Sequence, residues 1–181
     1  MKKPATFVLL LLMATNVAAT RVALVTGATK GIGLGIARGL GEAKYRVHIT
    51  GRTETGPGSL QEAAAAVEQA GGVCITHKVD HSDSAAIEAL FSSVLAAEPD
   101  GIDLLVNNVY PAVSMLGESF RSGKMKFWEL PTSEFADVNT VGLTAHYTAS
   151  AHYAKAMIPR GRGLIIQVSS PGGLFYFFTA A

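Results

Sequence analysis

Short apolar runs alternate with longer segments of helical periodicity through most of the chain. Runs rich in β-branched and other apolar residues predict five strands, at residues 21–25, 45–50, 73–79, 104–106 and 164–168. Helical spacing of apolar residues, or a high alanine content, predicts helices at residues 32–42, 59–69, 84–97 and 133–157. Residues 110–131 show neither period and are predicted to be irregular. Strands that alternate with helices of this length pair in parallel through right-handed crossovers, so the pattern predicts an α/β fold with a doubly wound parallel sheet.

The segment before the first strand has the layout of a secretory leader. A cationic start over residues 1–4 precedes an apolar run over residues 7–14, and Val17 and Ala19 stand three residues and one residue before Thr20. This order of regions is typical of a signal peptide, which predicts the secretory pathway, in particular the endoplasmic reticulum. The apolar run is shorter than the roughly 20 residues that span a bilayer. The alternatives are an N-terminal anchor that associates with a membrane, and a cytoplasmic protein whose N-terminal helix packs on the domain.

The rest of the chain is expected to form one domain. The whole sequence has 181 residues, with a leader or anchor over residues 1–19 and no internal repeat in the remainder. Fifteen basic and fourteen acidic residues give a net charge of +1, which offers no electrostatic basis for binding nucleic acid. Cys74 is the only cysteine, which excludes an intrachain disulfide and a cysteine-cluster zinc site. His146 and His152 lack the spacing of a metal pair on a helix, and no metal site is predicted.

A glycine-rich turn lies between the first predicted strand and the first predicted helix. It has the sequence Thr-Gly-Ala-Thr-Lys-Gly-Ile-Gly over residues 26–33. Glycines at this place allow a sharp turn and a close approach of the main chain to a diphosphate, and the N-terminus of the helix supplies unpaired N–H groups. The turn therefore predicts a dinucleotide site, with the candidate residues Gly27, Thr29, Lys30, Gly31, Ile32 and Gly33. The alternative is that the glycines only permit a tight turn.

The residues after the second predicted strand bear on which dinucleotide would bind. A site for NAD usually carries an acidic residue there, which bonds the ribose 2′-hydroxyl. This sequence instead has Thr-Gly-Arg-Thr over residues 50–53, without an acid. The guanidinium of Arg52 could pair with a 2′-phosphate, and Lys30 could add positive charge, which favours NADP over NAD. The alternative for Arg52 is an ordinary solvated surface arginine.

The glycine-rich turn, taken together with residues after the third and fourth predicted strands, resembles the sequence pattern of the short-chain dehydrogenase/reductase superfamily. The Thr-Gly-x-x-x-Gly-x-Gly spacing is followed by Asp80 after the third strand and by Asn107-Asn108 after the fourth. The resemblance extends from residue 21 to about residue 178 and implies that residues 20–181 form an NADP-binding, Rossmann-like domain. Three further segments resemble one branch of the superfamily more narrowly, namely Phe-Trp-Glu-Leu-Pro at 127–131, Asn-Thr-Val-Gly-Leu at 139–143 and Val-Ser-Ser-Pro-Gly at 168–172.

The resemblance implies a role for four more residues. Asp80 would accept a hydrogen bond from the adenine amino group, and Asn107 would brace the central strand and line the cofactor cleft. Asn139 matches the asparagine that holds a water in the proton relay of the family. Ser170 matches the serine that bonds the substrate carbonyl, although the adjacent Ser169 leaves the register open by one residue. Without the resemblance, Asn139 would be interpreted as an asparagine on the surface of a helix, and Ser169 and Ser170 as a pair of serines at the end of a strand.

The sequence departs from the family pattern in two places. Val109-Tyr110 follow the asparagine pair, where the family normally has Ala-Gly, and the bulk of Val109 bears on the close approach of the main chain to the cofactor. The family also uses a tyrosine that transfers the proton, with a lysine four residues later that lowers its pKa. Tyr176 is the only tyrosine after Ser170, and the fourth residue beyond it is Ala180. Tyr176 is therefore rejected as the catalytic acid.

The combined expectation is an NADP-dependent oxidoreductase that transfers hydride between nicotinamide and a carbonyl or alcohol substrate. The chain is expected to be a truncated form of it, with the cofactor half present and the catalytic Tyr/Lys pair absent. The alternatives are a catalytically silent dinucleotide-binding module and a nonfunctional fragment. Because members of the family usually pair through helices, the resemblance also implies a homo-oligomer.

Overall fold

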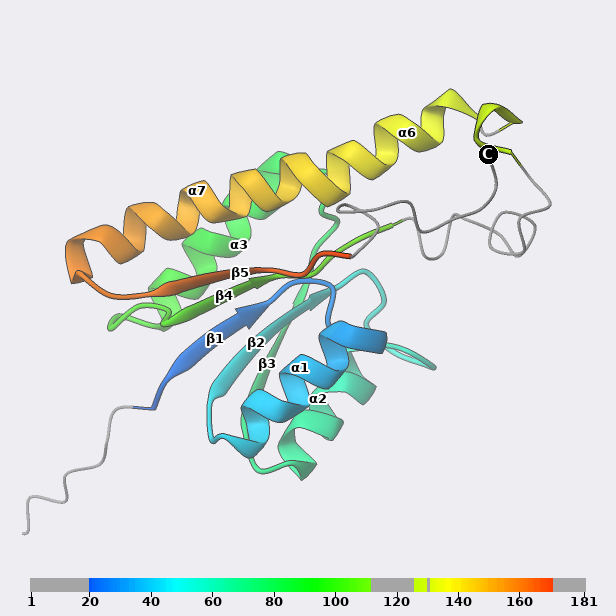
Figure 1. Cartoon of the computed structure of the whole chain (residues 1–181). Coiled ribbons are helices and arrows are strands. Elements are labelled where there is room, and N and C mark those ends of the chain that lie inside the picture. The colour runs from blue at the N-terminus through cyan, green and yellow to red at the C-terminus, as the bar shows by residue number, and fades with distance from the viewer. Residues whose placement is uncertain (1–19, 112–125, 130, 171–181) are drawn as a thin grey trace, which may run out of the picture.

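The described part of the protein is built on a five-stranded parallel sheet. A computed structural model describes residues 20–111, 126–129 and 131–170. Its strands follow the order β3-β2-β1-β4-β5 across the sheet, and every neighbouring pair is parallel (Figure 1). The strand order reverses beside β1, which is the arrangement of a doubly wound, Rossmann-like sheet and confirms the predicted fold class. The strands are β1 (Val22–Val25), β2 (Arg46–Gly51), β3 (Val73–Lys78), β4 (Leu104–Asn107) and β5 (Leu164–Gln167).

Helices cover both faces of this sheet. Two of them, α1 (Gly31–Glu42) and α2 (Leu60–Gln69), pack on one face. The other face carries α3 (Ser84–Ala97) and α7 (Ala145–Met157), which continues from α6 (Thr132–Asn139) (Figure 1). Four of these helices, α1, α2, α3 and α7, turn small or apolar residues toward the sheet, as amphipathic helices do. The central strand β1 is buried on both faces, since all four of its residues are buried.

Local side-chain caps explain why two of the predicted helix starts agree with the structure. The hydroxyl of Ser59 accepts the main-chain N–H of Glu62 at 3.3 Å at the start of α2. The carboxylate of Asp83 accepts the N–H of Ala85 at 2.8 Å at the start of α3. Such caps satisfy N–H groups that have no partner within the helix. At the other end of α2, Gly71 has a φ of +96°, a conformation that favours glycine and ends the helix.

The helix predicted at residues 133–157 differs from the structure in its middle. It consists of α6 and α7 joined by a π-helical turn at Thr140–Thr144, in which the N–H of Ala145 donates to the carbonyl of Thr140. Gly142 lies in this turn, and a Cβ there would come 2.8 Å from the ring of Tyr110. The wider turn thus coincides with the close approach of an aromatic ring from the segment after β4. In the segment predicted to be irregular, Phe127–Glu129 forms a 3₁₀ turn, whereas residues 112–125 and 130 lie outside the described part.

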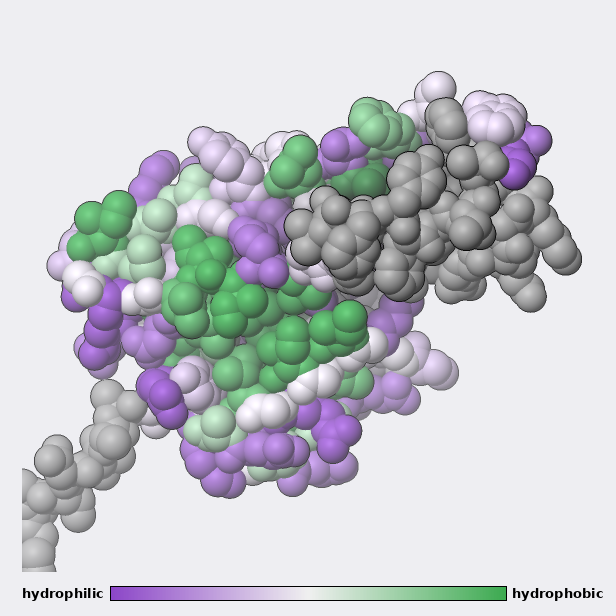
Figure 2. Space-filling view, viewed as in Figure 1, coloured by the Kyte–Doolittle hydropathy of each residue, from purple (hydrophilic) through white to green (hydrophobic). Residues whose placement is uncertain are grey.

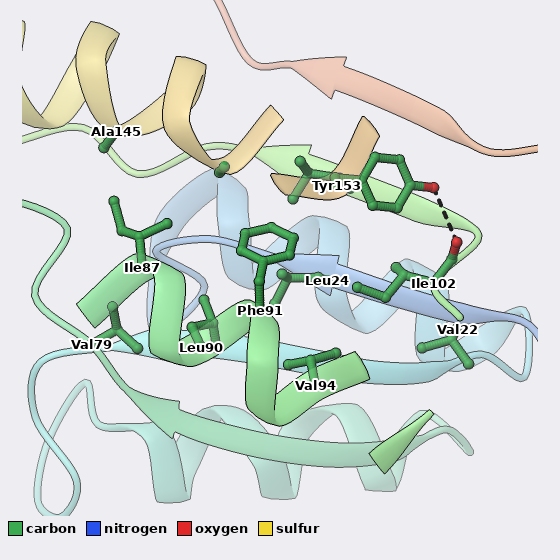
Figure 3. Packing of buried hydrophobic residues seen from close by; sticks show 12 residues of the cluster. Val22, Leu24, Val79, Ile87, Leu90, Phe91, Val94, Ile102, Ala145 and Tyr153 are labelled. Atoms are coloured by element: carbon green, nitrogen blue, oxygen red, sulfur yellow. Dashed lines mark hydrogen bonds between the residues drawn. The ribbon is translucent and has the colours of Figure 1, made fainter. Parts of the chain in front are cut away.

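A buried cluster joins α3 and α7 to the sheet. Phe91 of α3 and Tyr153 of α7 are each 1% exposed and lie among aliphatic side chains of β1 and β4 (Figure 3). The hydroxyl of Tyr153 donates to the carbonyl of Ile102 at 3.2 Å and accepts the N–H of Leu164 at 3.3 Å. A buried tyrosine whose hydroxyl is paired in this way adds apolar contact without leaving a polar atom unsatisfied. It therefore fixes α7 against β4 and β5.

On the sheet face that carries α1, the strand β5 has exposed apolar residues. Leu164 and Ile166 of β5 are 56% and 40% exposed, whereas Ile165, between them, packs into the cluster under α7. Figure 2 shows apolar side chains gathered between α7 and α1 in this region. Within the described residues, β5 is an edge strand, as the strand order shows.

The predicted leader is not part of this description. Residues 1–19 lie outside the described part of the chain, so the signal peptide or anchor stays a prediction. Among the helices that are described, none is long and apolar enough to pass through a bilayer.

Candidate nucleotide site at the carboxyl edge of the sheet

The glycine-rich turn connects β1 to α1 at the carboxyl edge of the sheet. Gly27 and Gly31 have φ values of +63° and +56°, which glycine adopts without strain. A Cβ at position 33 would come 2.6 Å from the carbonyl oxygen of Gly27, so only glycine fits between the helix and the turn. Beside Gly31, by contrast, no atom lies within 4 Å of where a Cβ would stand. The N-cap residue Lys30 makes no side-chain capping bond, and Gly31 and Ile32 at the start of α1 are exposed, so the side chain of Lys30 does not occupy the first N–H groups of the helix.

The other predicted residues of the turn lie around this opening. Thr29 is half-buried, and its methyl group lies against Gly51 at the end of β2. Lys30 is exposed, and the side chain of Ile32 is 67% exposed at the start of the helix. The turn thus lies at the N-terminus of α1, the positive end of the helix dipole, which favours an anion.

The neighbouring strand β4 holds the turn through Asn108, a residue to which sequence reasoning assigned no role of its own. Its side-chain amide donates to the carbonyl oxygens of Thr26 and Gly27, both at 3.0 Å. The hydroxyl of Thr26 donates to the carbonyl of Val106 at 3.3 Å and accepts the N–H groups of Asn108 and Val109 at 2.9 and 3.2 Å. These bonds fix the ends of β1 and β4 to each other. The pair Asn107-Asn108 at the end of a predicted strand is the sequence signal from which this role could have been predicted.

Val109 and Thr50 close the turn from two other sides. A Cβ at Gly27 would come 2.8 Å from the Cα of Val109, so the main chain at Val109 packs directly against the turn. On the β2 side, the hydroxyl of Thr50 accepts the N–H of Gly27, and its carbonyl accepts the N–H of Ala28, both at 3.0 Å. The bulk of Val109 is therefore accommodated beside Gly27. Thr50 is a second supporting residue that sequence reasoning missed.

Arg52 and Asp80 lie along the same edge of the sheet. Arg52 directly follows β2 and is exposed, and Asp80 follows β3 and is exposed. One carboxylate oxygen of Asp80 accepts the N–H and the hydroxyl of Ser82, at 2.9 and 2.8 Å. These two bonds, and then the nearby charge of Arg52, lower the pKa of Asp80. The edge thus presents an ionised carboxylate close to a guanidinium, next to the N-terminus of α1.

Asn107 is buried beneath this edge. Its side-chain amide donates to the hydroxyl of Ser150 at 2.9 Å and to the carbonyl of His146 at 3.4 Å, both on α7. It therefore ties the last residue of β4 to the helix that crosses behind it. Its side-chain oxygen is buried and has no hydrogen-bond partner within the described residues.

The two residues assigned to catalysis lie on other elements. Asn139 is the last residue of α6, and its amide donates to the carbonyl of Phe135 at 2.7 Å, immediately before the π-helical turn. Ser169 and Ser170 follow β5 and are exposed, at the carboxyl end of a strand adjacent to β4. Tyr176, which the sequence excluded as the acid, lies outside the described residues.

The histidines of α7 do not form a metal centre. His146 contacts the carbonyl of Val109 at 2.8 Å through Nε2, and the ring of His152 stacks on Phe91 with 5.7 Å between centroids. Burial lowers the pKa of His146, and its bonds to Val109 and Gln167 oppose that shift. In the part of the chain that is described, no three histidine, cysteine or acidic residues are grouped so as to hold a metal ion.

Curated relatives resemble this chain over most of its length. Dehydrogenase/reductase SDR family member 1 of Mus musculus is 41% identical over 158 residues, and the Homo sapiens protein of the same name is 39% identical. This is the branch that the sequence segments indicated. Each alignment covers 87% of this chain and 49% of the relative, so the chain spans about half the length of these curated relatives.

Solved structures agree with the fold. A metagenomic short-chain oxidoreductase crystallised in complex with NADP is 35% identical and superposes with a TM-score of 0.69, over 83% of this chain and 62% of that one. An NAD⁺-bound xylitol dehydrogenase has the same fold, with 24% identity and a TM-score of 0.72 over 87% of this chain and 55% of that one. The family described as short chain dehydrogenase matches residues 21–181. With the sheet order and the glycine turn, these matches show that the chain belongs to the short-chain dehydrogenase/reductase family of oxidoreductases.

Proposed function

We propose that this protein binds NADP at the carboxyl edge of the sheet and carries the cofactor half of an NADP-dependent oxidoreductase. The observation that carries the proposal is the first turn of α1, which has no side-chain cap, at the same edge of the sheet as the exposed Arg52, which directly follows β2. An N-terminal helix turn binds a diphosphate through its N–H groups, and a guanidinium recognises a further phosphate. The segment Thr-Gly-Arg-Thr over residues 50–53, at the end of β2, holds no acidic residue that would instead bond a ribose 2′-hydroxyl.

The residues present fit such a dinucleotide. Gly33 lets α1 approach the turn, and the space beside Gly31, which no side chain fills, leaves room for the diphosphate. Lys30 and Arg52 are exposed at the same edge, where they would add charge around the phosphates. Asp80, held ionised by Ser82, would accept a hydrogen bond from the adenine amino group.

The proposed reaction is hydride transfer between nicotinamide and a carbonyl or alcohol substrate. When bound, the nicotinamide would supply or accept the hydride. Ser170 would bond the substrate oxygen, and Asn139 would hold a water of the proton relay near the π-helical turn. The name of the metagenomic relative, an oxidoreductase in complex with NADP, supports this assignment.

A second candidate is a dinucleotide-binding module without catalysis. Among the described residues, the bonds of Thr50 and Asn108 hold the glycine turn without Asn139, so the site can bind a dinucleotide whether or not hydride transfer follows. Under this candidate, the protein binds NADP as tightly as the first proposal requires but leaves NADPH unoxidised in the presence of any carbonyl. Steady NADPH oxidation above the blank would exclude the silent module.

The decisive experiment is calorimetric titration of the protein with NADP⁺ and NAD⁺. We expect tighter binding of NADP⁺, and we expect Arg52→Asp to weaken NADP⁺ binding by about 10- to 100-fold, the value of one or two charge-assisted hydrogen bonds. NAD⁺ binding should change far less. Arg38→Asp is the matched control, because Arg38 is exposed on the same helix side of the sheet but lies in the third turn of α1. Equal affinity for the two dinucleotides, or an unchanged preference in Arg52→Asp, would contradict the role of Arg52.

A further inference from the structure

A buried histidine is connected to the glycine turn through one hydroxyl. His81, directly after Asp80, is 5% exposed, and its Nε2 lies 2.8 Å from the hydroxyl oxygen of Thr50. The same oxygen accepts the main-chain N–H of Gly27 at 3.0 Å. Gly27 is the first glycine of the turn and holds a φ of +63°. A continuous chain of two hydrogen bonds therefore runs from the end of β3, across the end of β2, to the turn between β1 and α1.

The hydroxyl of Thr50 can donate to the Nε2 of His81 or accept from it, depending on the tautomer of the ring. A threonine hydroxyl has one proton to donate, and the Thr50 oxygen already accepts the N–H of Gly27. Within the described residues, His81 is the one acceptor recorded for that proton. We assign the arrangement that gives this proton an acceptor: the Nε2 of His81 accepts, and the neutral ring carries its own proton on Nδ1. Nδ1 is buried and has no hydrogen-bond partner in the described part of the chain, so nothing fixes the ring from its other side.

The surroundings of the imidazole favour the neutral form. Burial lowers the pKa of His81 from 6.5 to about 4, and His146 on α7 acts in the same direction. Asp80, the preceding residue, acts in the opposite direction, but its own carboxylate is engaged by Ser82 and faces Arg52. At neutral pH the ring therefore acts as a hydrogen-bond acceptor and not as a cation.

We propose that His81 is a positioning residue for the dinucleotide site, which acts through the hydroxyl of Thr50 on the N–H of Gly27. By accepting the proton of Thr50, it keeps the threonine oxygen turned toward Gly27, and it thereby holds the glycine turn in the shape that receives a diphosphate. This inference rests on the proposed function, since it assigns a supporting residue to the same site. It concerns the diphosphate region, which NADP and NAD share, and not the 2′-phosphate.

The test is a double-mutant cycle on dinucleotide affinity, measured by calorimetry near pH 7.5. His81→Leu and Thr50→Val should each weaken binding by about tenfold, and by the same factor for NADP⁺ and NAD⁺, as expected for the loss of one hydrogen bond that shapes the turn. The double variant should bind as Thr50→Val does, because His81 has no effect without the hydroxyl. His81→Gln, whose side-chain oxygen can accept the same proton, should restore affinity to within about twofold of the original.

A spectroscopic measurement keeps the inference testable when a variant does not fold. The ¹⁵N–¹H correlation spectrum of the histidine side chains in the original protein should show His81 neutral, with its proton on Nδ1. A proton on Nε2 would overturn the inference, and so would unchanged affinity in His81→Leu or additive losses in the double variant. If the original protein binds neither dinucleotide while folded, the proposed function itself fails. If it binds NADP⁺ and His81→Leu binds equally well, only the role of His81 fails.

Discussion

Acid should destabilise this protein through a pair of histidines, His48 and His77, on the α3 side of the sheet. His48 of β2 is fully buried, and its Nδ1 lies 2.9 Å from the Nε2 of His77 on β3. On its other side, the Nε2 of His48 contacts the carboxylate of Glu98 at 3.0 Å, and Arg46 lies 3.5 Å from the same oxygen. Since the carboxylate accepts the proton of His48, the Nδ1 of His48 accepts from His77. The pair is thus satisfied when both rings are neutral.

The size of the effect follows from the lowered pKa values. Burial, and then the charge of His48, lower the pKa of His77 from 6.5 to about 4, and burial also lowers the pKa of His48 despite the opposing effect of Glu98. The unfolded chain takes up protons near pH 6.5 while the folded chain does not, so this stabilisation is complete above that pH and is lost as the pH falls toward 4. Between pH 7.5 and pH 5, His77 alone accounts for about 2 kcal/mol of lost stability.

Urea unfolding followed by circular dichroism at the two pH values measures this loss. In His77→Gln, whose amide can still donate to His48, the difference between pH 7.5 and pH 5 should shrink by about 2 kcal/mol. Lys78→Gln is the control on the same strand: it removes an exposed ion pair with Glu54 at 2.8 Å and leaves both imidazoles in place. The reasoning is refuted if the unfolding free energy is flat over this pH range, or if His77→Gln retains the full dependence.

Two further substitutions probe the turn and the core. Gly33→Ala should weaken NADP⁺ binding by at least tenfold in calorimetry, because the new Cβ would come 2.6 Å from the carbonyl oxygen of Gly27 and would push α1 away from the turn; an alanine variant that binds normally would contradict this packing. Phe91→Ala should lower the unfolding free energy in urea by about 3–5 kcal/mol, since Phe91 is 1% exposed within the cluster of α3 and α7. Ser92→Ala, at the exposed neighbouring position, should change the unfolding free energy by less than about 0.5 kcal/mol. A similar loss in both variants would contradict the explanation that Phe91→Ala destabilises the protein by leaving a cavity.

The elements that the sequence predicted are those that depend on local patterns. Apolar runs and helical spacing located all five strands and the helices α1, α2, α3 and α7, because burial on one or two faces imposes its period on the sequence. The glycine turn was predicted for a similar reason, since the need for a positive φ at Gly27 and Gly31 restricts the residue type at those positions.

The supporting bonds of the site, by contrast, could not be predicted from local patterns. Asn108 lies more than eighty residues from the turn that it holds, and Thr50 and His81 come from two further strands. A spacing rule cannot anticipate bonds between elements whose register is set only when the sheet forms. The π-helical turn is a similar case, because it accompanies the packing of Tyr110 against Gly142, which no periodicity records.

Ser150 of α7 is one link between the part of the sheet edge that forms the glycine turn and the part that carries the proposed catalytic residues. Among the described residues, the bonds of Thr26, Thr50 and Asn108 that shape the glycine turn come from the ends of β1, β2 and β4, whereas Asn139 and Ser170 lie on α6 and after β5. The two parts meet at Ser150 of α7, whose hydroxyl accepts from Asn107 at 2.9 Å and from Gln167 of β5 at 3.2 Å. The bonds that Thr50 and Asn108 make to the glycine turn are thus separate from the roles proposed for Asn139 and Ser170 in catalysis. A failure of turnover would leave the binding proposal standing, and only the dinucleotide titration can decide it.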